Sequence, residues 1–361
     1  MKVLFDHQVF SWQKTGGVSR YFTELMTKMI QKKINIFLSG IFTENIYIKK
    51  INNSLKKVSN YYIPGKTILI KKINKISTIN TLNKNNFDII HPTGYDPYVF
   101  KYLKKSKLVI TIHDMIYEKF PEYFPKSGAE NKKKMILSAD AIIAVSNKTK
   151  EDIISLLKVN PKNIYVVHQG GLMGVKNEVK NSENPLKYFL YVGDRDKYKN
   201  FSLLIEEIKY ILKKNKKIKI LCVGGGKFKT KELDLMGEFK NRFIQLNLTD
   251  KELIWAYRHA LALIITSLYE GFGIPVIEAM SLECPVILNK TSSLPEVAGD
   301  AGLYYDSNKK NDLKNKINYL LNNPKQKKEL IRKGYLRAKK FSWEKCVKET
   351  ISVYKKVLKE K

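Results

Sequence analysis

The chain has 361 residues, of which 43% are hydrophobic and 11% aromatic; this composition excludes an intrinsically disordered protein, and at about 150 residues per domain the length predicts two domains. Lys and Arg outnumber Asp and Glu by 66 to 34, giving a formal net charge of +32, which suits either a lysine-rich solvated surface or an anionic partner. Only six of the 66 basic residues are Arg, and because base-reading proteins favour the planar Arg side chain, we do not expect a nucleic acid as partner.

Short apolar runs with the character of β-strands alternate with amphipathic helical segments through the first half of the chain. Helical periodicity extends over Tyr21–Gln31 and Thr149–Leu157, for example. Strand, helix and strand in succession indicate a parallel sheet. The predicted strands of this half are Lys2–Phe5, Ile34–Leu38, Asp88–His91, Lys107–His113, Ala141–Ser146 and Asn163–His168.

The alternation stops at residues 173–186, a polar stretch without periodicity that is typical of an inter-domain linker. It then restarts, with helices predicted from Phe201, Lys251 and about Pro275, and beyond Asp306 the chain becomes helical and basic. The predicted strands of this half are Tyr188–Val192, Lys217–Val223, Phe243–Leu246, Leu261–Thr266 and Pro285–Leu288.

These elements predict two doubly wound α/β domains, one over residues 1–172 and one over residues 187–340. Residues 341–361 have the periodicity of a final amphipathic helix. In open α/β sheets, ligands bind beyond the carboxyl ends of the strands. The loops that follow the predicted strands are therefore the places to search for a functional site.

The cysteines and the N-terminus bear on where the protein resides. Cys222, Cys284 and Cys346 lie far apart, without a CxxC pair or a neighbouring His cluster, so we expect neither a disulfide framework nor a zinc site. Residues 1–7 lack the apolar core of a signal peptide, and no stretch approaches 18 consecutive apolar residues. We expect a cytoplasmic protein that does not span a membrane.

Residues 31–86 are unusually basic, with eleven Lys and a single acid, Glu44. Phe37, Phe42 and three tyrosines are interspersed among the lysines. A basic segment with aromatic residues suits the surface of an anionic bilayer, where each Lys contributes about 1 kcal/mol. A solvated loop in a lysine-rich protein explains the same pattern, and the sequence leaves both interpretations open.

Two loops of the first predicted domain have features of a ligand site. Gly16 and Gly17 open a helix after the first strand, where glycines let a ligand approach the backbone and the helix N-terminus attracts anions. His113 ends the strand that begins at Lys107 and places an imidazole at a carboxyl edge. Each feature alone is equally typical of an ordinary turn or a structural histidine.

The loop after the first strand of the second domain contains Arg195 and Lys199 before a helix. Both side chains could face a phosphate there, Arg by its planar fork and Lys as a point charge. Asp194 and Asp196 form an Asp-x-Asp string of the kind that holds a divalent metal in some enzymes. We reject that interpretation because Arg195 and the neighbouring lysines would repel a cation.

The segment from Glu270 to Glu278 is the most informative part of the sequence. A Gly-Phe-Gly turn follows a strand, and Pro275 suits the first turn of a helix, so the helix N-terminus offers free amides to a diphosphate. In a continuous helix the two glutamates would lie about 12 Å apart, farther than the roughly 5 to 9.5 Å of a glycosidase pair. They suit hydroxyls at the two ends of a long ligand, such as ribose and a sugar.

Together these motifs resemble those of a known family. The run Glu270–Glu278 is an E-x7-E motif, and with the other motifs the chain resembles retaining glycosyltransferases of family 4, which have the GT-B fold. The resemblance extends over nearly the full length, and the motifs occur in the family's order. The other motifs are Gly16-Gly17, His113-Asp114, Arg195 with Lys199, and the closing Phe341-Ser342-Trp343-Glu344.

The resemblance implies two Rossmann-like domains that face each other across a cleft, with the last helix crossing back onto the first domain. The second domain would bind a nucleotide-diphosphate sugar, with Glu278 at the ribose and Glu270 at the transferred sugar. Arg195 and Lys199 would neutralise the leaving diphosphate in place of a metal, so no metal or other cofactor is expected. The remaining implied contacts are Gly16 and Gly17 at the diphosphate, His113 at the sugar, the amides of Phe272, Gly273 and Ile274, and Asn247 and Leu248 at the base.

The family also implies transfer with retention of configuration and without a protein nucleophile. The sequences of two motifs, Gly16–Phe22 and Tyr198–Phe201, resemble those of family members that build bacterial surface polysaccharides. We therefore expect a hexose donor, preferably GDP-mannose, and a lipid-linked oligosaccharide acceptor at the inner face of the cytoplasmic membrane. Residues 31–86 would contact that membrane.

Two other functions remain open from the sequence. A basic protein with degenerate α/β domains could bind nucleic acid or a membrane without catalysis, and it would show steeply salt-dependent binding. A hydrolase or phosphorylase with the same fold would release the sugar to water or phosphate. Product analysis with and without a sugar acceptor distinguishes these enzymes from a transferase.

Overall fold

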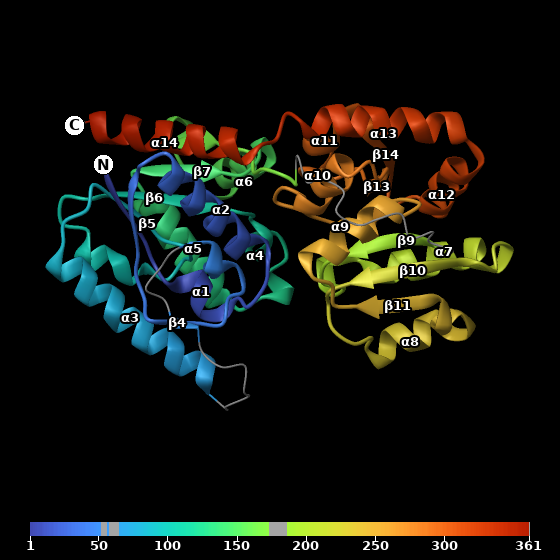
Figure 1. The fold of residues 1–361 in the computed structure, drawn as a ribbon, viewed down its shortest axis with the longest axis horizontal. Coiled ribbons are helices and arrows are strands. Elements are labelled where there is room, and N and C mark those ends of the chain that lie inside the picture. The colour runs from blue at the N-terminus through green and yellow to red at the C-terminus, as the bar shows by residue number, and fades with distance from the viewer. Residues whose placement is uncertain (52–55, 58–64, 173–185, 361) are drawn as a thin grey trace. The chain divides into compact units, whose positions relative to one another are not determined.

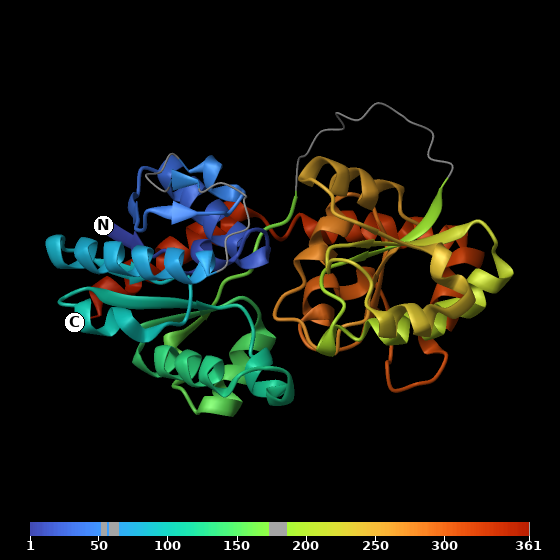
Figure 2. The same cartoon turned by 90° about the horizontal axis from the view of Figure 1, so that it is seen from below.

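The computed structural model describes residues 1–51, 56–57, 65–172 and 186–360. The chain divides into two compact units, which we call unit 1 (Met1–Gln169 with Trp343–Lys361) and unit 2 (Gly170–Ser342). Each unit has a six-stranded parallel sheet with helices packed on it (Figure 1; Figure 2). The predicted linker at 173–186 lies outside the described residues, except for Leu186.

The sheet of unit 1 has the strand order β2-β1-β5-β6-β7-β8, and every pair is parallel. Val3 of β1 lies opposite Ile36 on one side and Ile89 on the other. The central strands are apolar because both faces of the sheet are covered. The strands are β1 (Lys2–Phe5), β2 (Asn35–Leu38), β5 (Ile89–His91), β6 (Lys107–Ile112), β7 (Ala141–Ala144) and β8 (Ile164–Val166), with a separate parallel pair, β3 (Phe42–Thr43) and β4 (Lys56–Lys57).

Unit 1 also contains helices that pack around its sheet, and the last helix of the chain is one of them. The helices are α1 (Gln8–Trp12), α2 (Gly17–Gln31), α3 (Lys66–Lys84), α4 (Ile116–Lys119), α5 (Lys126–Ser138), α6 (Asn147–Leu157) and α14 (Trp343–Lys359). Between β2 and β5, where the sequence suggested a solvated loop or a basic membrane segment, the structure has β3, β4 and the 19-residue helix α3.

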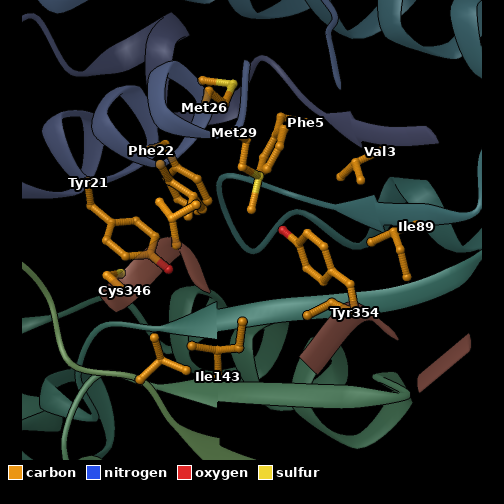
Figure 3. Close-up of a cluster of buried hydrophobic side chains, with 14 of the residues drawn as sticks. Val3, Phe5, Tyr21, Phe22, Met26, Met29, Ile89, Ile143, Cys346 and Tyr354 are labelled. Carbon is orange, nitrogen blue, oxygen red and sulfur yellow. The ribbon is translucent and has the colours of Figure 1, made fainter. Parts of the chain in front are cut away.

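The buried cluster on one face of the unit 1 sheet includes side chains from α14 (Figure 3). Cys346 and Tyr354 of α14 are 0% exposed and lie with Phe5, Tyr21 and other core residues. Tyr354 Oη also lies 2.5 Å from His91 Nδ1 at the end of β5. Helix α14 therefore completes the core of unit 1 although it follows unit 2 in the chain.

The sheet of unit 2 repeats the pattern with the order β11-β10-β9-β12-β13-β14, again with parallel pairs. The last strand of this sheet, β14, was not predicted. The strands are β9 (Lys187–Val192), β10 (Ile218–Val223), β11 (Phe243–Leu246), β12 (Leu263–Ile265), β13 (Val286–Asn289) and β14 (Gly302–Tyr305), and the helices are α7 (Phe201–Lys214), α8 (Thr230–Met236), α9 (Asp250–His259), α10 (Ile274–Ser281), α11 (Leu294–Ala298), α12 (Asp312–Asn322) and α13 (Pro324–Ala338).

The boundary between the units lies slightly before the predicted residue 172. Gly171 belongs to unit 2 because its amide donates to the carbonyl of Phe341 at 3.4 Å. A Cβ atom on Gly171 would lie 2.3 Å from Cγ2 of Ile277, so only glycine fits against α10 here. Phe341 and Ser342 likewise belong to unit 2, and the final helix begins at Trp343 instead of residue 341.

The three cysteines are free and buried, as expected of a protein without disulfides. Burial raises the pKa of each thiol to about 12, so none is a thiolate near neutral pH. Within the described residues, no helix is both long and apolar enough to cross a membrane.

Candidate active site

The topology of unit 2 indicates a candidate ligand site at the carboxyl ends of β9 and β12. The chain builds β10 and β11 on one side of β9 and then returns to place β12 on the other side. Loops that follow neighbouring strands diverge at such a switch in strand order, and ligands bind there in open α/β sheets. Lys199 follows β9 and Glu270 follows β12, so both lie at the switch.

Lys199 and Glu270 form an ion pair at this position. Lys199 Nζ lies 2.6 Å from Glu270 Oε1, and Ser267 donates a hydrogen bond of 2.6 Å to the same oxygen. The two side chains are 20% and 16% exposed, respectively, so the pair is largely shielded yet reachable from solvent. The backbone carbonyl of Lys199 accepts from Thr266 Oγ1 at 2.8 Å, which fixes the loop after β9 against the end of β12.

The charge of Lys199 is secured by its surroundings. Burial alone would lower the pKa of Lys199, but Glu270, Tyr198 and Asp194 together raise it above its ordinary value. The ammonium therefore stays protonated at neutral pH. A shielded cation beside a carboxylate can stabilise a negative charge that develops on a ligand more strongly than a solvated one.

The turn between Glu270 and α10 has the predicted form. Gly273 adopts a φ of +97° and precedes α10, whose second residue is Pro275, and a side chain at Gly273 would crowd Leu294 at 3.1 Å. The amides of Gly273 and Ile274 form no hydrogen bond with any described residue, as is normal for a helix N-terminus that can bind an anion. Phe272 instead buries its ring against Phe341, at 5.8 Å between centroids.

Two serines from the loop after β13 hold this turn in place. The carbonyl of Glu270 accepts hydrogen bonds from Ser292 Oγ at 2.6 Å and Ser293 Oγ at 2.8 Å. Ser293 also donates to the carbonyl of Phe272 at 3.0 Å. Neither serine was predicted from the sequence, because no motif connects them to residues some 20 positions earlier.

Glu278, the second glutamate of the motif, lies within α10 and is only 4% exposed. Its Oε2 accepts a hydrogen bond of 3.1 Å from the hydroxyl of Tyr257 on α9. Tyr257 is 0% exposed, so its ring is fixed and its hydroxyl has one direction. A buried carboxylate held in this way can accept hydrogen bonds from ligand hydroxyls with little loss of entropy.

Arg195 differs from the expectation that its fork faces a phosphate. Its Nε donates to Glu232 Oε1 at 2.8 Å, its Nη1 donates to the carbonyl of Gly224 at 2.8 Å, and its Nη2 donates to carbonyls of the next three residues. The side chain is 3% exposed. Carbonyls that converge after β10 attract the guanidinium inward, so Arg195 holds the loop of residues 224–227.

Asn247 and Leu248 follow β11, the edge strand two positions from β9. Asn247 Oδ1 accepts from Gln245 at 3.1 Å, and Thr249 caps α9 together with Glu252. No hydrogen bond in the described structure connects these two residues with Lys199, Glu270 or Glu278.

In unit 1, the Gly16-Gly17 pair opens α2 as predicted. Part of the helix N-terminus is already occupied, because Gln13 Oε1 accepts from the amide of Ser19 at 2.8 Å. A Cβ atom on Gly16 would lie 2.4 Å from the Gln13 side chain, so glycine lets Gln13 fold over the helix end. The amides of Gly17 and Val18 have no partner among the described residues.

His113 lies directly after β6 and pairs with a residue that sequence reasoning missed. Its Nδ1 is 3.2 Å from Nε2 of Gln169, the last residue before unit 2. The other ring nitrogen, Nε2, is buried and has no partner among the described residues. Burial lowers the pKa of His113 to about 4, although Asp114 opposes this shift. His113 is therefore a neutral imidazole near neutral pH, and one of its ring nitrogens can donate a hydrogen bond while the other can accept one.

The Asp-Arg-Asp string is held by protein groups. Asp196 forms an ion pair of 2.5 Å with Lys229, and the backbone carbonyl of Asp194 accepts from the Tyr191 hydroxyl at 2.7 Å. Among the described residues, no three His, Cys, Asp or Glu side chains are grouped so that they could hold a metal ion.

Family models match both halves of the chain. Residues 15–170 match Glycosyltransferase Family 4, and residues 175–337 match Glycosyl transferases group 1. The chain is a family 4-like glycosyltransferase. It is 25% identical to O-antigen chain mannosyltransferase B from Escherichia coli, covering 98% of this chain and 100% of the relative. It is 29% identical to O-antigen chain mannosyltransferase RfbU from Salmonella typhimurium, covering 54% and 55% of the two chains.

Solved structures show that this glycosyltransferase has the GT-B fold. Sucrose-phosphate synthase from Thermosynechococcus elongatus matches with a TM-score of 0.77 and 16% identity, covering 100% of this chain and 99% of the other. Anabaena HepE in complex with UDP-glucose matches with a TM-score of 0.76 and 17% identity over 99% of each chain. The predicted fold class is thereby confirmed.

Proposed function

We propose that this glycosyltransferase transfers a hexose, with retention of configuration, from a nucleotide-diphosphate sugar to a growing lipid-linked surface oligosaccharide. GDP-mannose is the preferred donor, because the relatives named above are mannosyltransferases of O-antigen chains. Unit 2 binds the donor, and the protein works at the inner face of the cytoplasmic membrane. The complexes of HepE with UDP and UDP-glucose support a nucleotide sugar as the donor class.

The ion pair of Lys199 and Glu270 at the switch point is the observation that carries the proposal. Lys199 offers a protonated, shielded ammonium where a diphosphate would leave, and the amides of Gly273 and Ile274 offer two more donors nearby in sequence. Glu270, once its Lys199 partner binds phosphate, accepts hydrogen bonds from the sugar. Glu278 accepts hydrogen bonds from the ribose.

In the proposed reaction, a bond forms between the acceptor oxygen and the anomeric carbon while the bond from that carbon to the diphosphate oxygen breaks. The electron pair goes to the diphosphate, and the acceptor proton goes to the leaving phosphate oxygen. Lys199 stabilises the negative charge on the leaving group. Electrostatic stabilisation of this kind commonly contributes most to the rate of such transfers. We propose that a metal is not required, because Lys199 supplies this charge.

One of the expected roles changes in this proposal, and another becomes more specific. Arg195 acts by holding residues 224–227 beside the loop after β9, since its donors are used by protein groups. His113 donates from Nε2 to a hydroxyl of the substrate sugar, since its low pKa keeps it neutral. Gly17, Asn247 and Leu248 keep their proposed donor contacts.

A thermal-shift screen with UDP, GDP, ADP, dTDP and CMP, each with and without EDTA, tests the proposal first. Binding to the native state raises stability by RT ln(1 + [L]/Kd). We expect a selective rise with GDP that EDTA does not reduce. The nucleotide that stabilises the protein then identifies the sugar donor for a transfer assay, in which product is analysed with and without acceptor.

Variants with matched controls connect the screen to the site. Lys199→Ala should lower turnover by at least about a hundredfold, whereas Lys213→Ala, which removes an exposed lysine of α7, should leave it unchanged. Glu278→Ala should weaken binding of the free nucleotide, and Glu270→Ala should lower turnover more than nucleotide affinity. Unchanged nucleotide affinity in Glu278→Ala would contradict the ribose role, and sugar release that is independent of acceptor would favour a hydrolase.

A further inference from the structure

Helix α3 of unit 1 directs large apolar side chains toward solvent. Ile68, Ile76 and Leu69 are 62%, 60% and 59% exposed, and they are the three most exposed large hydrophobic side chains among the described residues. Ile68, Lys72 and Ile76 are spaced four residues apart, so they form one stripe along the helix. The helix itself lies at the periphery of unit 1 (Figure 1; Figure 2).

The opposite side of α3 holds the helix in this rotation. Asn74 is 0% exposed; its Oδ1 accepts from the amides of Ile41 and Phe42 at 2.7 and 2.9 Å, and its Nδ2 donates to Ser11 Oγ at 2.8 Å. Thr78, also 0% exposed, lies 2.9 Å from Ser39 Oγ. These buried contacts would be lost if the helix rotated to bury Ile68 and Ile76, so the exposed stripe is a fixed surface.

The same surface is strongly basic. The sequence of α3 contains five lysines and no acid. Lys71 and Lys72 are exposed and form no ion pair with any described residue, whereas Lys75 pairs with Asp96 at 2.9 Å. Exposed apolar side chains beside unpaired lysines match the boundary between anionic headgroups and acyl chains. A second copy of α3 would bring like charges together.

We propose that the stripe of Ile68, Leu69, Lys72 and Ile76, which we call the α3 stripe, docks the protein on an anionic lipid bilayer. The apolar side chains enter the headgroup region, and Lys71 and Lys72 pair with lipid phosphates. The proposal rests on the proposed function only for its purpose, because a lipid-linked acceptor would be presented at such a surface. Vesicle binding itself requires no sugar transfer.

Vesicle flotation tests the α3 stripe, using phosphatidylcholine vesicles with and without about 30 mol% phosphatidylglycerol at low salt. We expect binding only to the anionic vesicles and release at high salt, which screens the charges. Replacing Ile68, Leu69 and Ile76 together by Ser should weaken binding at least about tenfold. The matched control replaces Ile30, Leu137 and Leu156 by Ser, which are 44%, 57% and 40% exposed on other helices of unit 1, and should bind as the wild type does.

A charge series completes the test. Lys71→Gln with Lys72→Gln should weaken binding about fivefold per lysine, whereas the same change at the exposed Lys133 and Lys134 of α5 should have a smaller effect. The native cysteines are buried, so a fluorescent probe on Leu69→Cys can report insertion by a blue shift, with Leu137→Cys as the control.

The outcomes separate this proposal from the proposed function. No binding of the wild type to anionic vesicles, or equal binding by the α3 and control triple variants, overturns the α3 stripe. Nucleotide binding is measured on the same samples. An α3 triple variant that loses vesicle binding but retains nucleotide binding supports the stripe. A wild-type protein that binds anionic vesicles but no nucleotide contradicts only the proposed transferase site.

Discussion

The hydrogen bond between Tyr257 and Glu278 provides a sharp test of the donor site. Tyr257→Phe removes one hydroxyl from a buried ring and leaves the ring itself in place. Glu278, 4% exposed, then has one donor fewer for a carboxylate oxygen that accepted a 3.1 Å hydrogen bond. If Glu278 binds the ribose, losing the group that orients it must weaken nucleotide binding.

The size of the effect follows from the charge and burial of the acceptor. A hydrogen bond to a charged group contributes about 1.5 to 3 kcal/mol, and part of the loss falls on the folded state without ligand. We expect about 1 to 2 kcal/mol in binding, or roughly a five- to thirtyfold higher Kd. Isothermal titration with the stabilising nucleoside diphosphate and with its 2′,3′-dideoxy counterpart measures the change.

The dideoxy nucleotide and a control variant distinguish orientation from general damage. Tyr257→Phe should weaken the ribonucleotide much more than the dideoxy form, because only the former has hydroxyls for Glu278. Tyr188→Phe removes an equally buried hydroxyl of unit 2, which donates to the carbonyl of Ala256 at 2.8 Å, and should leave both affinities unchanged. Equal weakening of both nucleotides by Tyr257→Phe, or no weakening, would refute the reasoning.

Three further predictions follow from the same structure. Lys199→Ala should lower kcat by at least about a hundredfold with little loss of fold, because the leaving group loses its cation; wild-type turnover would contradict the role. Arg195→Lys keeps the charge but cannot bridge the converging carbonyls of residues 224–227, so we expect about 2 kcal/mol less stability in urea unfolding and weaker nucleotide binding; an unchanged midpoint would argue against the loop-holding role. Burial lowers the pKa of His91 to about 3, so the unfolded chain takes up the proton first and stability is lost as pH falls below about 6.5, by about 2 kcal/mol at pH 5 from this group. His91→Gln should flatten that dependence in urea unfolding between pH 7 and 5, and an equally steep dependence in the variant would exclude His91 as its source.

The sequence by itself determined the class of fold and the position of the most informative turn. Every strand predicted for the two sheets is present. The central strands were recognisable because strands covered on both faces are apolar, and such runs are visible without knowing their neighbours. The Gly273 turn and the start of α10 beside Pro275 were also predictable from local sequence. A positive φ favours glycine, and proline suits the first helical turn.

Periodicity failed where a helix does not have a single apolar face. Helix α3 was not predicted, because it buries polar Asn74 and Thr78 while exposing Ile68 and Ile76, so no amphipathic pattern is visible in its sequence. These isoleucines face outward because the opposite side of α3 forms hydrogen bonds with the β2–β3 region. Those partners lie more than 30 residues away, so no local pattern reveals them.

Only the tertiary structure decided which site residues meet. Lys199 and Glu270 are 71 positions apart, and they pair because β9 and β12 are neighbours at a switch in strand order. Arg195 lies in the same loop as Lys199, yet its side chain points toward the carbonyls after β10, whereas that of Lys199 points toward Glu270 after β12. Sequence specifies which side chains can bind charge and where strands end, but the direction of a long side chain depends on acceptors that distant segments bring to it.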